Sequence, residues 1–186
     1  MKLFINRKIA ILITIIVAIL ATLFGVGKSL DYLAREVEVM FYNGVYLEDA
    51  GYTQPGISQH LENIGQSALD ASSAFAGHTE LSGELEALQN ARLGLTNADS
   101  ITEKYIAYQI MQHSFTAFLE KAEHVELSEH DKGLLALYSA TFTGATGAIQ
   151  NSEYNVKASG FLDEVSFIAR LLRPLVFVTA PQSFDS

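Results

Sequence analysis

The sequence predicts an all-α protein in which an N-terminal transmembrane helix continues into an antiparallel helical bundle with a long C-terminal helix. An uncharged apolar run occupies residues 9–27. The segments after it repeat their apolar residues at the three- to four-residue spacing of one helix face. No stretch alternates apolar and polar residues for long enough to predict a sheet. The connections between the segments are short, which favours antiparallel neighbours.

The N-terminal run reads IAILITIIVAILATLFGVG. As a helix it would be about 28 Å long at roughly 1.5 Å per residue, close to the thickness of a bilayer core. The alternative is a cleaved signal peptide, with a basic start at Lys2 to Lys8 and a cleavage site at Gly25-Val26-Gly27. The run is longer than a signal core, which favours the anchor. Apolar residues also continue past it at heptad spacing, at Leu30, Leu33, Val37, Met40 and Gly44.

The charges around this run predict a topology. Lys2, Arg7 and Lys8 precede the span, whereas Lys28 and Arg35 follow it. An excess of basic residues before the span favours a cytoplasmic N-terminus. We therefore expect a single-pass protein of the cell membrane, with a short cytoplasmic tail at 1–8, a transmembrane helix at 9–27 and an extracytoplasmic bundle at 28–186.

The composition excludes several classes of function. Residues 1–28 carry four basic residues and no acidic one, and the rest of the chain carries eight basic residues against 21 acidic ones. That remainder has a formal net charge of −13, so it repels nucleic acid phosphates and we expect no nucleic acid partner. The chain has no cysteine, which excludes disulfides, thiolate catalysis and iron–sulfur clusters.

Four segments after the span carry helical stripes of apolar residues. Capping patterns at Ser100 to Glu103 and at Ser128 to Asp131 predict where the third and fourth of these helices begin. The first three stripes are Ile57, Leu61, Ile64, Ala68, Ala71 and Phe75; Leu81, Leu85, Leu88, Ala91 and Leu95; and Ile101, Tyr105, Tyr108, Met111, Phe115, Phe118 and Ala122.

The fourth stripe changes its register part-way along. It begins as Leu135, Tyr138, Phe142, Ala145, Ile149, Ser152 and Val156, and continues as Tyr154, Ala158, Phe161, Val165, Ile168 and Leu172. Such a shift indicates a local change in winding. The helix therefore either exceeds 40 residues or bends near Asn155 to Gly160.

The same helix carries a ridge of small residues, formed by Ala140, Gly144 and Ala148. This ridge predicts a close backbone approach within the chain or, as the alternative, a surface for self-association.

The residues that could carry chemistry do not assemble into a recognisable site. The five histidines show no metal-ligand spacing, and the run Glu120, Glu123, Glu126 and Glu129 is better explained as a solvated acidic face. Gly25-Val26-Gly27-Lys28-Ser29 imitates part of a phosphate-binding loop, but it lies at the end of an apolar span and lacks the first glycine. We predict no enzyme activity, no catalytic residue, no metal and no cofactor.

Nearly the whole chain resembles the LemA family of bacterial membrane-anchored helical proteins, in its short, acidic form typical of Firmicutes. Most of the resemblance lies in Glu153-Tyr154-Asn155-Val156-Lys157-Ala158-Ser159-Gly160-Phe161. It is similar to a late family motif formed here by Tyr154, Asn155, Ala158 and Phe161. The sequence departs from the family at Leu162, where Asn is usual, and at Arg173-Pro174, where Phe-Pro is usual. Pro181-Gln182-Ser183-Phe184 resembles the Pro-x-x-Phe ending of close relatives.

The resemblance implies an anchored helical bundle whose biochemical function is not established, with Tyr154 and Asn155 as helix-packing residues. Our first functional hypothesis is an interaction or scaffold protein of the cell envelope that uses an acidic bundle, has an unidentified protein partner and can form a homo-oligomer. The alternative is an extracytoplasmic sensory or ligand-binding bundle that signals through a membrane partner.

Overall fold

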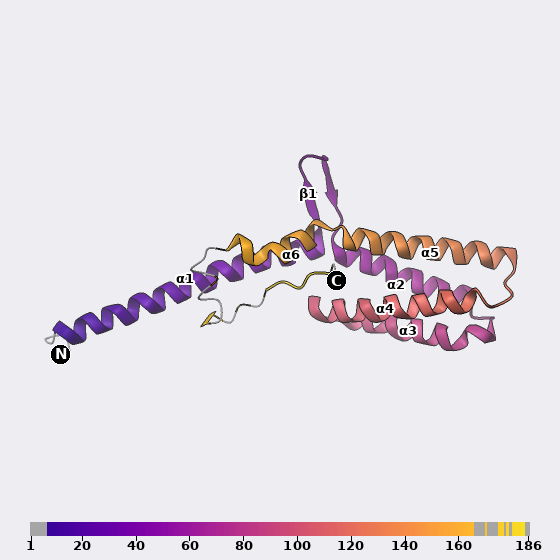
Figure 1. Cartoon of the computed structure of the whole chain (residues 1–186), viewed down its shortest axis with the longest axis horizontal. Helices are drawn as coiled ribbons and strands as arrows, with labels where there is room; N and C mark the ends of the chain where they lie inside the picture. The colour runs from indigo at the N-terminus through magenta and orange to yellow at the C-terminus, as the bar shows by residue number, and fades with distance from the viewer. Residues whose placement is uncertain (1–6, 166–169, 171–174, 177, 179, 185–186) are drawn as a thin grey trace. The chain divides into compact units, whose positions relative to one another are not determined.

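The computed structural model describes residues 7–165, 170, 175–176, 178 and 180–184 (Figure 1). The all-α prediction is confirmed. The elements in order are α1 (Arg7–Asn43), β1 (Val45–Leu47), β2 (Tyr52–Gln54), α2 (Ile57–Ala74), a 3-10 turn (Thr79–Leu81), α3 (Ser82–Asn97), α4 (Ile101–Ala122), α5 (Glu129–Gln150) and α6 (Glu153–Glu164). The chain divides into two compact units, one formed by Met1–Val39 with Lys157–Pro181 and the other by Met40–Val156 with Gln182–Ser186.

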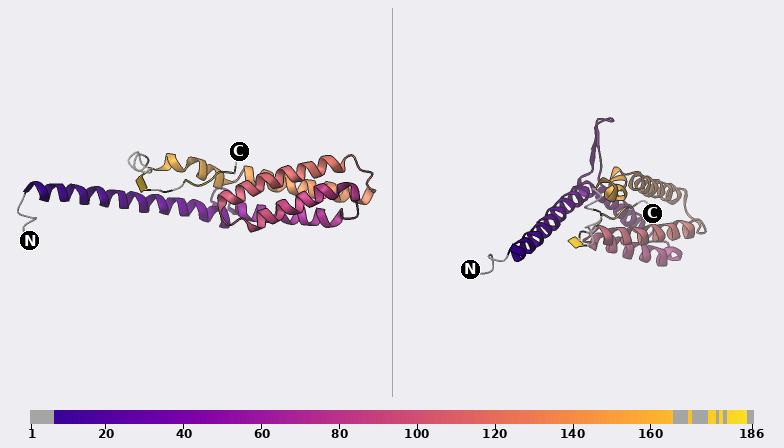
Figure 2. Two further views of the ribbon diagram at one scale, coloured as in Figure 1. Left: turned by 90° about the horizontal axis from the view of Figure 1, so that it is seen from below. Right: turned by 60° about the vertical axis from the view of Figure 1, so that its left-hand side comes forward.

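The second unit contains an antiparallel bundle of α2, α3, α4 and α5 (Figures 1 and 2). α2 packs against α3 and α5, and α3 packs against α4. Every residue of the first two predicted stripes is buried, and so is the third stripe from Tyr108 onward. Burial of these stripes removes apolar surface from water and is the main source of the bundle's stability.

The predicted helix starts at α4 and α5 are confirmed. Ser100 accepts a hydrogen bond from the N–H of Glu103, and the Glu103 carboxylate accepts one from the N–H of Ser100. This reciprocal pair is a capping box. At α5, the Ser128 hydroxyl accepts a hydrogen bond from the Asp131 N–H at 3.1 Å. These caps fix where the third and fourth bundle helices begin.

The predicted long helix is broken at Asn151–Ser152, between α5 and α6, so a continuous helix of more than 40 residues and a bend near Asn155 to Gly160 are both wrong. The break explains the shift of the apolar stripe, because Tyr154 is fully buried and Val156 is 61% exposed. Its local cause is Asn155, whose side-chain Nδ2 donates to the Ile149 carbonyl at 2.7 Å. The same carbonyl also accepts a hydrogen bond from the Ser152 N–H at 3.2 Å, so a backbone group and a side chain together close the end of α5.

The predicted close approach at the small-residue ridge of α5 is wrong. Apart from the neighbouring backbone of α5 itself, no atom of the described residues lies within 4 Å of the place where a Cβ on Gly144 would be, and Gly133, Gly147 and Gly160 are equally open. Ala140 and Gly144 are exposed, because the buried face of α5 is the one that carries Phe142, Ala145 and Ile149. The ridge lies on the other side of the helix.

A short hairpin between α1 and α2 was not predicted from the sequence. β1 and β2 pair antiparallel, with Tyr46 opposite Thr53, and the hairpin projects from the bundle (Figure 2). Gly44 ends α1 with a φ of 80°, and a Cβ there would collide with the Gln54 carbonyl. Glycine is the residue that adopts this conformation without strain. Each strand has three residues, which is too short to show an alternating pattern.

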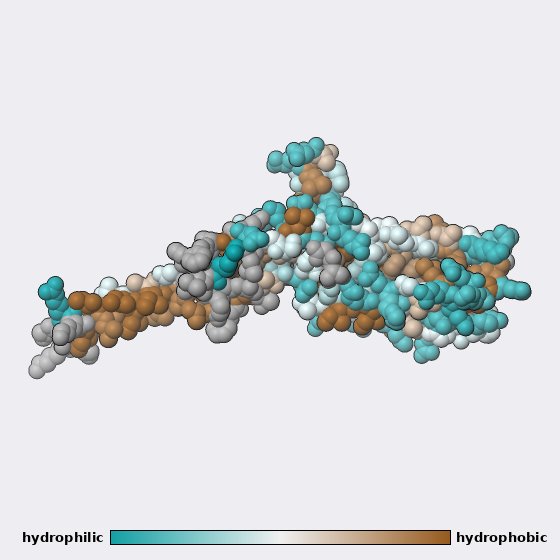
Figure 3. Space-filling model, viewed as in Figure 1, coloured by the Kyte–Doolittle hydropathy of each residue, from teal (hydrophilic) through white to brown (hydrophobic). Residues whose placement is uncertain are grey.

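Residues Ile9–Asn43 of α1, which belong to the first unit as far as Val39, form a helix long and apolar enough to cross a membrane. Its apolar side chains between Ile11 and Phe24 are largely exposed and form the brown band of Figure 3. The helix continues without a break beyond the apolar run, as predicted. Leu30 and Val37, two residues of the predicted heptad continuation, are buried.

Candidate functional site

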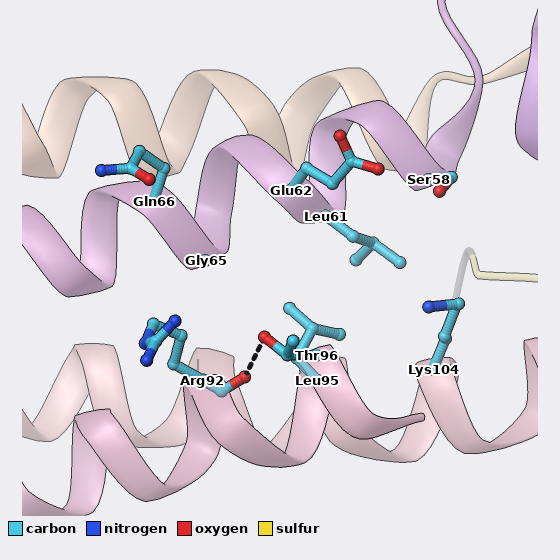
Figure 4. A pocket seen from close by; sticks show the side chains of 9 residues that line it. All are labelled: Ser58, Leu61, Glu62, Gly65, Gln66, Arg92, Leu95, Thr96 and Lys104. Carbon is cyan, nitrogen blue, oxygen red and sulfur yellow. Dashed lines mark hydrogen bonds between the residues drawn. The ribbon is translucent and has the colours of Figure 1, made fainter. Parts of the chain in front are cut away.

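A pocket of about 380 Å³ lies in the bundle between α2 on one side and α3 with the start of α4 on the other (Figure 4). Its volume is at the small end of the range for small-molecule sites. The lining residues are Ser58, Leu61, Glu62, Gly65, Gln66, Arg92, Leu95, Thr96 and Lys104.

The periodicity of the helices places these side chains around the pocket. Leu61 and Leu95 are members of the buried stripes of α2 and α3 and contribute apolar surface. Arg92 and Thr96 are four residues apart, so they share a face of α3. The Thr96 hydroxyl donates to the Arg92 carbonyl at 2.9 Å. Lys104 comes from the first turn of α4 and extends toward α2, as Arg92 does (Figure 4).

Gly65 lies beside the Arg92 side chain. A Cβ on Gly65 would lie 3.9 Å from Arg92 Cγ, which is ordinary van der Waals contact. An alanine at position 65 would therefore fit beside the aliphatic part of Arg92. Long basic side chains commonly bury their stems in this way while the charged head faces the open side.

Arg92 and Lys104 are the unusual residues of the pocket because neither has an ion-pair partner in the described part of the chain. The Nε atom of Arg92 is buried and donates no hydrogen bond. A buried donor without an acceptor costs roughly 1–3 kcal/mol. Residues Met40–Val156 contain 15 acidic and four basic residues. Half of those basic residues therefore line this one pocket, in a region where carboxylates are plentiful.

The other two basic residues of this region behave differently. Lys132 forms an ion pair with Glu129, with Nζ 2.7 Å from Oε1, and Lys121 lies in the last turn of α4, where the helix dipole favours a positive charge. Each therefore has a local electrostatic reason for its position. The pocket cations have none within the residues that the structure describes.

The family-motif residues Tyr154 and Asn155 form a second polar centre, which holds the C-terminal segment. The Tyr154 hydroxyl donates to the Gln182 carbonyl at 2.7 Å. The Asn155 Oδ1 accepts a hydrogen bond from the Phe184 N–H at 2.8 Å, while its Nδ2 donates to Ile149. Asn155 therefore joins the end of α5 to the C-terminal segment, which is a larger role than the helix packing that the resemblance implied.

Phe184 is the centre of an aromatic cluster in this unit. Its side chain is 1% exposed, and its ring centroid lies between 5.2 and 6.4 Å from those of four other aromatic residues. Edge-to-face and tilted pairs at such separations are favourable. The four partners are Phe41, Tyr105, Tyr108 and Tyr154.

Ala158 and Phe161, the other two motif residues, belong to the first unit. Both are buried, with side chains 5% and 2% exposed. Each of the four motif residues is therefore buried within its own unit. Tyr154 and Asn155 alone form the polar centre that holds the C-terminal segment.

The histidines and acidic residues considered from the sequence do not converge. His78 Nε2 lies 3.5 Å from Asp131 Oδ2, whereas His113, His124 and His130 are exposed, as are all four glutamates of the acidic run. Burial lowers the pKa of His60. The hydrogen bond from the Ser128 hydroxyl is the main cause of a lowered pKa at Asp131. No group of three potential metal ligands occurs among the described residues.

Sequence reasoning missed the pocket cations and Phe184. The signal for Arg92 and Lys104 was their rarity, since residues 40–156 hold four basic residues in total. Phe184 belongs to the Pro-x-x-Phe ending of the sequence, but a single aromatic residue carries no periodicity. Its partners could not be inferred without the fold.

The described residues define the class: an all-α protein in which they contain one helix of membrane-spanning length and a four-helix bundle that carries a polar pocket. Comparison of the chain with protein-family models, curated proteins and solved structures found no match. The LemA resemblance therefore stays a hypothesis that these comparisons do not test.

Proposed function

We propose that this protein is a LemA-like, single-pass protein of the cell membrane whose bundle lies outside the cytoplasm and works by binding another protein. The continuous helix α1 carries this proposal. Its apolar run between Ile9 and Gly27 has exposed side chains suited to lipid, and the same helix continues to Asn43. An uninterrupted helix of this kind would hold the following domain at the membrane surface.

The charge of the bundle supports binding as its mode of action. Residues Met40–Val156 carry a formal net charge of −11, and hydrophilic residues cover the end of the bundle where α4 meets α5 in Figure 3. The four glutamates of the acidic run are exposed; they are Glu120, Glu123, Glu126 and Glu129. An acidic surface of this kind favours a basic protein surface and accelerates encounter with it.

The experiment is crosslinking and affinity capture of the full-length protein from its own membrane. We expect a basic partner that is released as salt rises, because ions screen exposed charges over about 8 Å at physiological ionic strength. A variant in which the four glutamates of the acidic run become glutamine should lose the partner. The matched control neutralises Glu48 and Asp49 at the hairpin tip and should retain it. Capture of the same partner by the neutralised protein, at every salt concentration, would contradict the proposal.

Topology is tested separately. Protease added to intact cells whose outer wall has been removed should cleave within residues 40–156, and protection until lysis would reverse the orientation.

Binding without catalysis predicts that changing any one histidine to glutamine leaves the biological activity intact. Loss of that activity in a folded, abundant variant would indicate a catalytic site instead.

A further inference from the structure

A short segment late in the chain, residues 175–178, lies against the end of the apolar run of α1. Both belong to the first unit. A Cβ placed on Gly27 would lie 3.6 Å from the Cβ of Val176, which is ordinary van der Waals contact. An open groove of about 790 Å³ lies between α1 and this segment. It is lined from α1 by Leu23, Phe24 and Lys28, among others, and from the 175–178 segment by Leu175, Val176 and Val178.

The exposure of α1 shows where its covered face begins. Residues 11–22 are all exposed, as a helix surrounded by lipid requires (Figure 3). Leu23 and Gly27 are only partly exposed, and Leu30 is 1% exposed. These three positions have the spacing of one helix face, whereas Phe24 on another face stays 69% exposed. The covered face of α1 therefore starts inside the apolar run and not after it.

The length of the apolar run places this cover at the depth of the membrane. If α1 spans the bilayer, the run 9–27 is about 28 Å long at roughly 1.5 Å per residue, against a bilayer core of about 30 Å. Without residues 23–27 the run would be about 21 Å long, which is too short to cross the core. Leu23 and Gly27 must therefore lie within the membrane boundary, and the residues packed against them lie at the same depth.

The groove has the polarity that a lipid at this boundary requires. Leu175 is 61% exposed and shares the groove with the exposed ring of Phe24. Contact of these side chains with acyl chains removes their apolar surface from water. Lys28 follows the apolar run directly, and its Nζ lies 5.5 Å from the centre of the Phe24 ring. Lysine side chains near the end of a span extend to the membrane interface, where the lipid phosphates are.

We propose that the 175–178 segment forms a second contact with the membrane, and that an acyl chain of a bilayer phospholipid fills the groove between this segment and α1. The phosphate group of that lipid lies at the level of Lys28. The inference rests on the membrane anchoring proposed for α1. It adds to that anchoring a lipid site that two distant parts of the chain form together.

The test uses tryptophan as a reporter of depth, because the chain contains no tryptophan of its own. Full-length Leu175→Trp, Phe24→Trp and Leu137→Trp are each placed in vesicles of phosphatidylcholine and phosphatidylglycerol. Bromine atoms on the acyl chains, which quench tryptophan on contact, are placed either near the headgroup or near the chain end. We expect Leu175→Trp and Phe24→Trp to lose most of their emission with bromine near the headgroup, and less with bromine near the chain end. Leu137 is 57% exposed on α5, and tryptophan there should lose none.

The three reporters separate this inference from the anchoring of α1. Quenching of Phe24→Trp without quenching of Leu175→Trp would overturn the second membrane contact and leave the anchor standing. If neither is quenched, the anchoring of α1 fails and the lipid site fails with it. Equal quenching of Leu137→Trp would show that every exposed position meets lipid, which would also overturn the site.

Two glycine variants test the groove itself, with Leu175→Trp as the reporter in both. Gly27→Leu places a side chain where Val176 packs, so it should displace the segment and reduce the quenching. Gly25→Leu is the matched control. Apart from the neighbouring backbone of α1, no atom of the described residues lies within 4 Å of a Cβ on Gly25, so the quenching should not change. Circular dichroism shows that each variant keeps its helices. Equal quenching in the two variants would overturn the contact of the 175–178 segment with α1.

Discussion

Replacing Phe184 with alanine should destabilise the second unit strongly, although this residue lies far along the chain from the helices that it contacts. The side chain is 1% exposed and lies among four aromatic rings. Truncation of a buried phenylalanine typically costs about 3–5 kcal/mol, which includes the cavity that it leaves. The C-terminal segment can also detach from the bundle. The loss in free energy of unfolding therefore cannot exceed the free energy that docking of this segment contributes. We expect a loss of about 3 kcal/mol.

The assay is urea unfolding of the full-length protein in detergent, followed by circular dichroism, together with hydrogen exchange at the Phe184 amide. That amide donates to Asn155 Oδ1, so it should be protected in the native protein and lose protection in Asn155→Ala. The two changes act on one contact, so the Phe184→Ala and Asn155→Ala double variant should lose less than the sum of the single losses. Leu93→Ala is the control, because Leu93 is 47% exposed and should change stability by no more than about 0.5 kcal/mol. A loss below about 1 kcal/mol in Phe184→Ala, with an unprotected amide in the native protein, would refute the docking argument.

Three further results are expected. Gly144→Ala should raise the melting temperature, with a gain of up to about 1 kcal/mol from helix propensity, because the Cβ meets open space; a lower melting temperature would restore the close-approach hypothesis. Ser100→Ala should cost about 1 kcal/mol through loss of the cap at α4. Hydrogen bonds from the Ser100 and Asp99 N–H groups lower the pKa of Glu103. Its contribution should therefore be present above the unfolded pKa of about 4.3 and be lost as pH falls through the lower folded value, so wild type and Glu103→Gln should converge in stability in acid. Val17→Arg should reduce membrane insertion by about 2.5–3.5 kcal/mol, measured as the fraction of protein in the membrane pellet; unchanged partition would argue against the span.

The sequence predicted the features of the fold that repeat. The stripes from Ile57 to Phe75 and from Leu81 to Leu95 are buried as expected. They could be predicted because many residues contribute to each periodic pattern, so that one atypical residue does not obscure it. The caps at Ser100 and Ser128 were also predicted, because an N-cap depends on residues three positions apart. Both kinds of signal are local, and the fold did not override them.

The features that depend on one side chain or on distant parts of the chain were not predicted. The break at Asn151–Ser152 depends on the side chain of Asn155 reaching back to Ile149, and periodicity does not report such a bond. The same pattern could not decide which side of α5 faces the bundle at Gly144, since small residues fit both a buried contact and an exposed face. The presence of Arg92 and Lys104 at one pocket depends on the packing of α3 against both α2 and α4.

The position of Phe184 in the chain has a consequence for how the protein is made. Synthesis proceeds from the N-terminus, and helices with local contacts can pack while the chain is still growing. The last of the helices α2 to α5 ends at Gln150, whereas the aromatic cluster needs Phe184, 29 positions after Asn155. Until that residue is made, the rings of Phe41, Tyr108 and Tyr154 lack their central partner. A stop codon before position 184 would therefore leave a chain with all four bundle helices and an aromatic cluster that stays open to water.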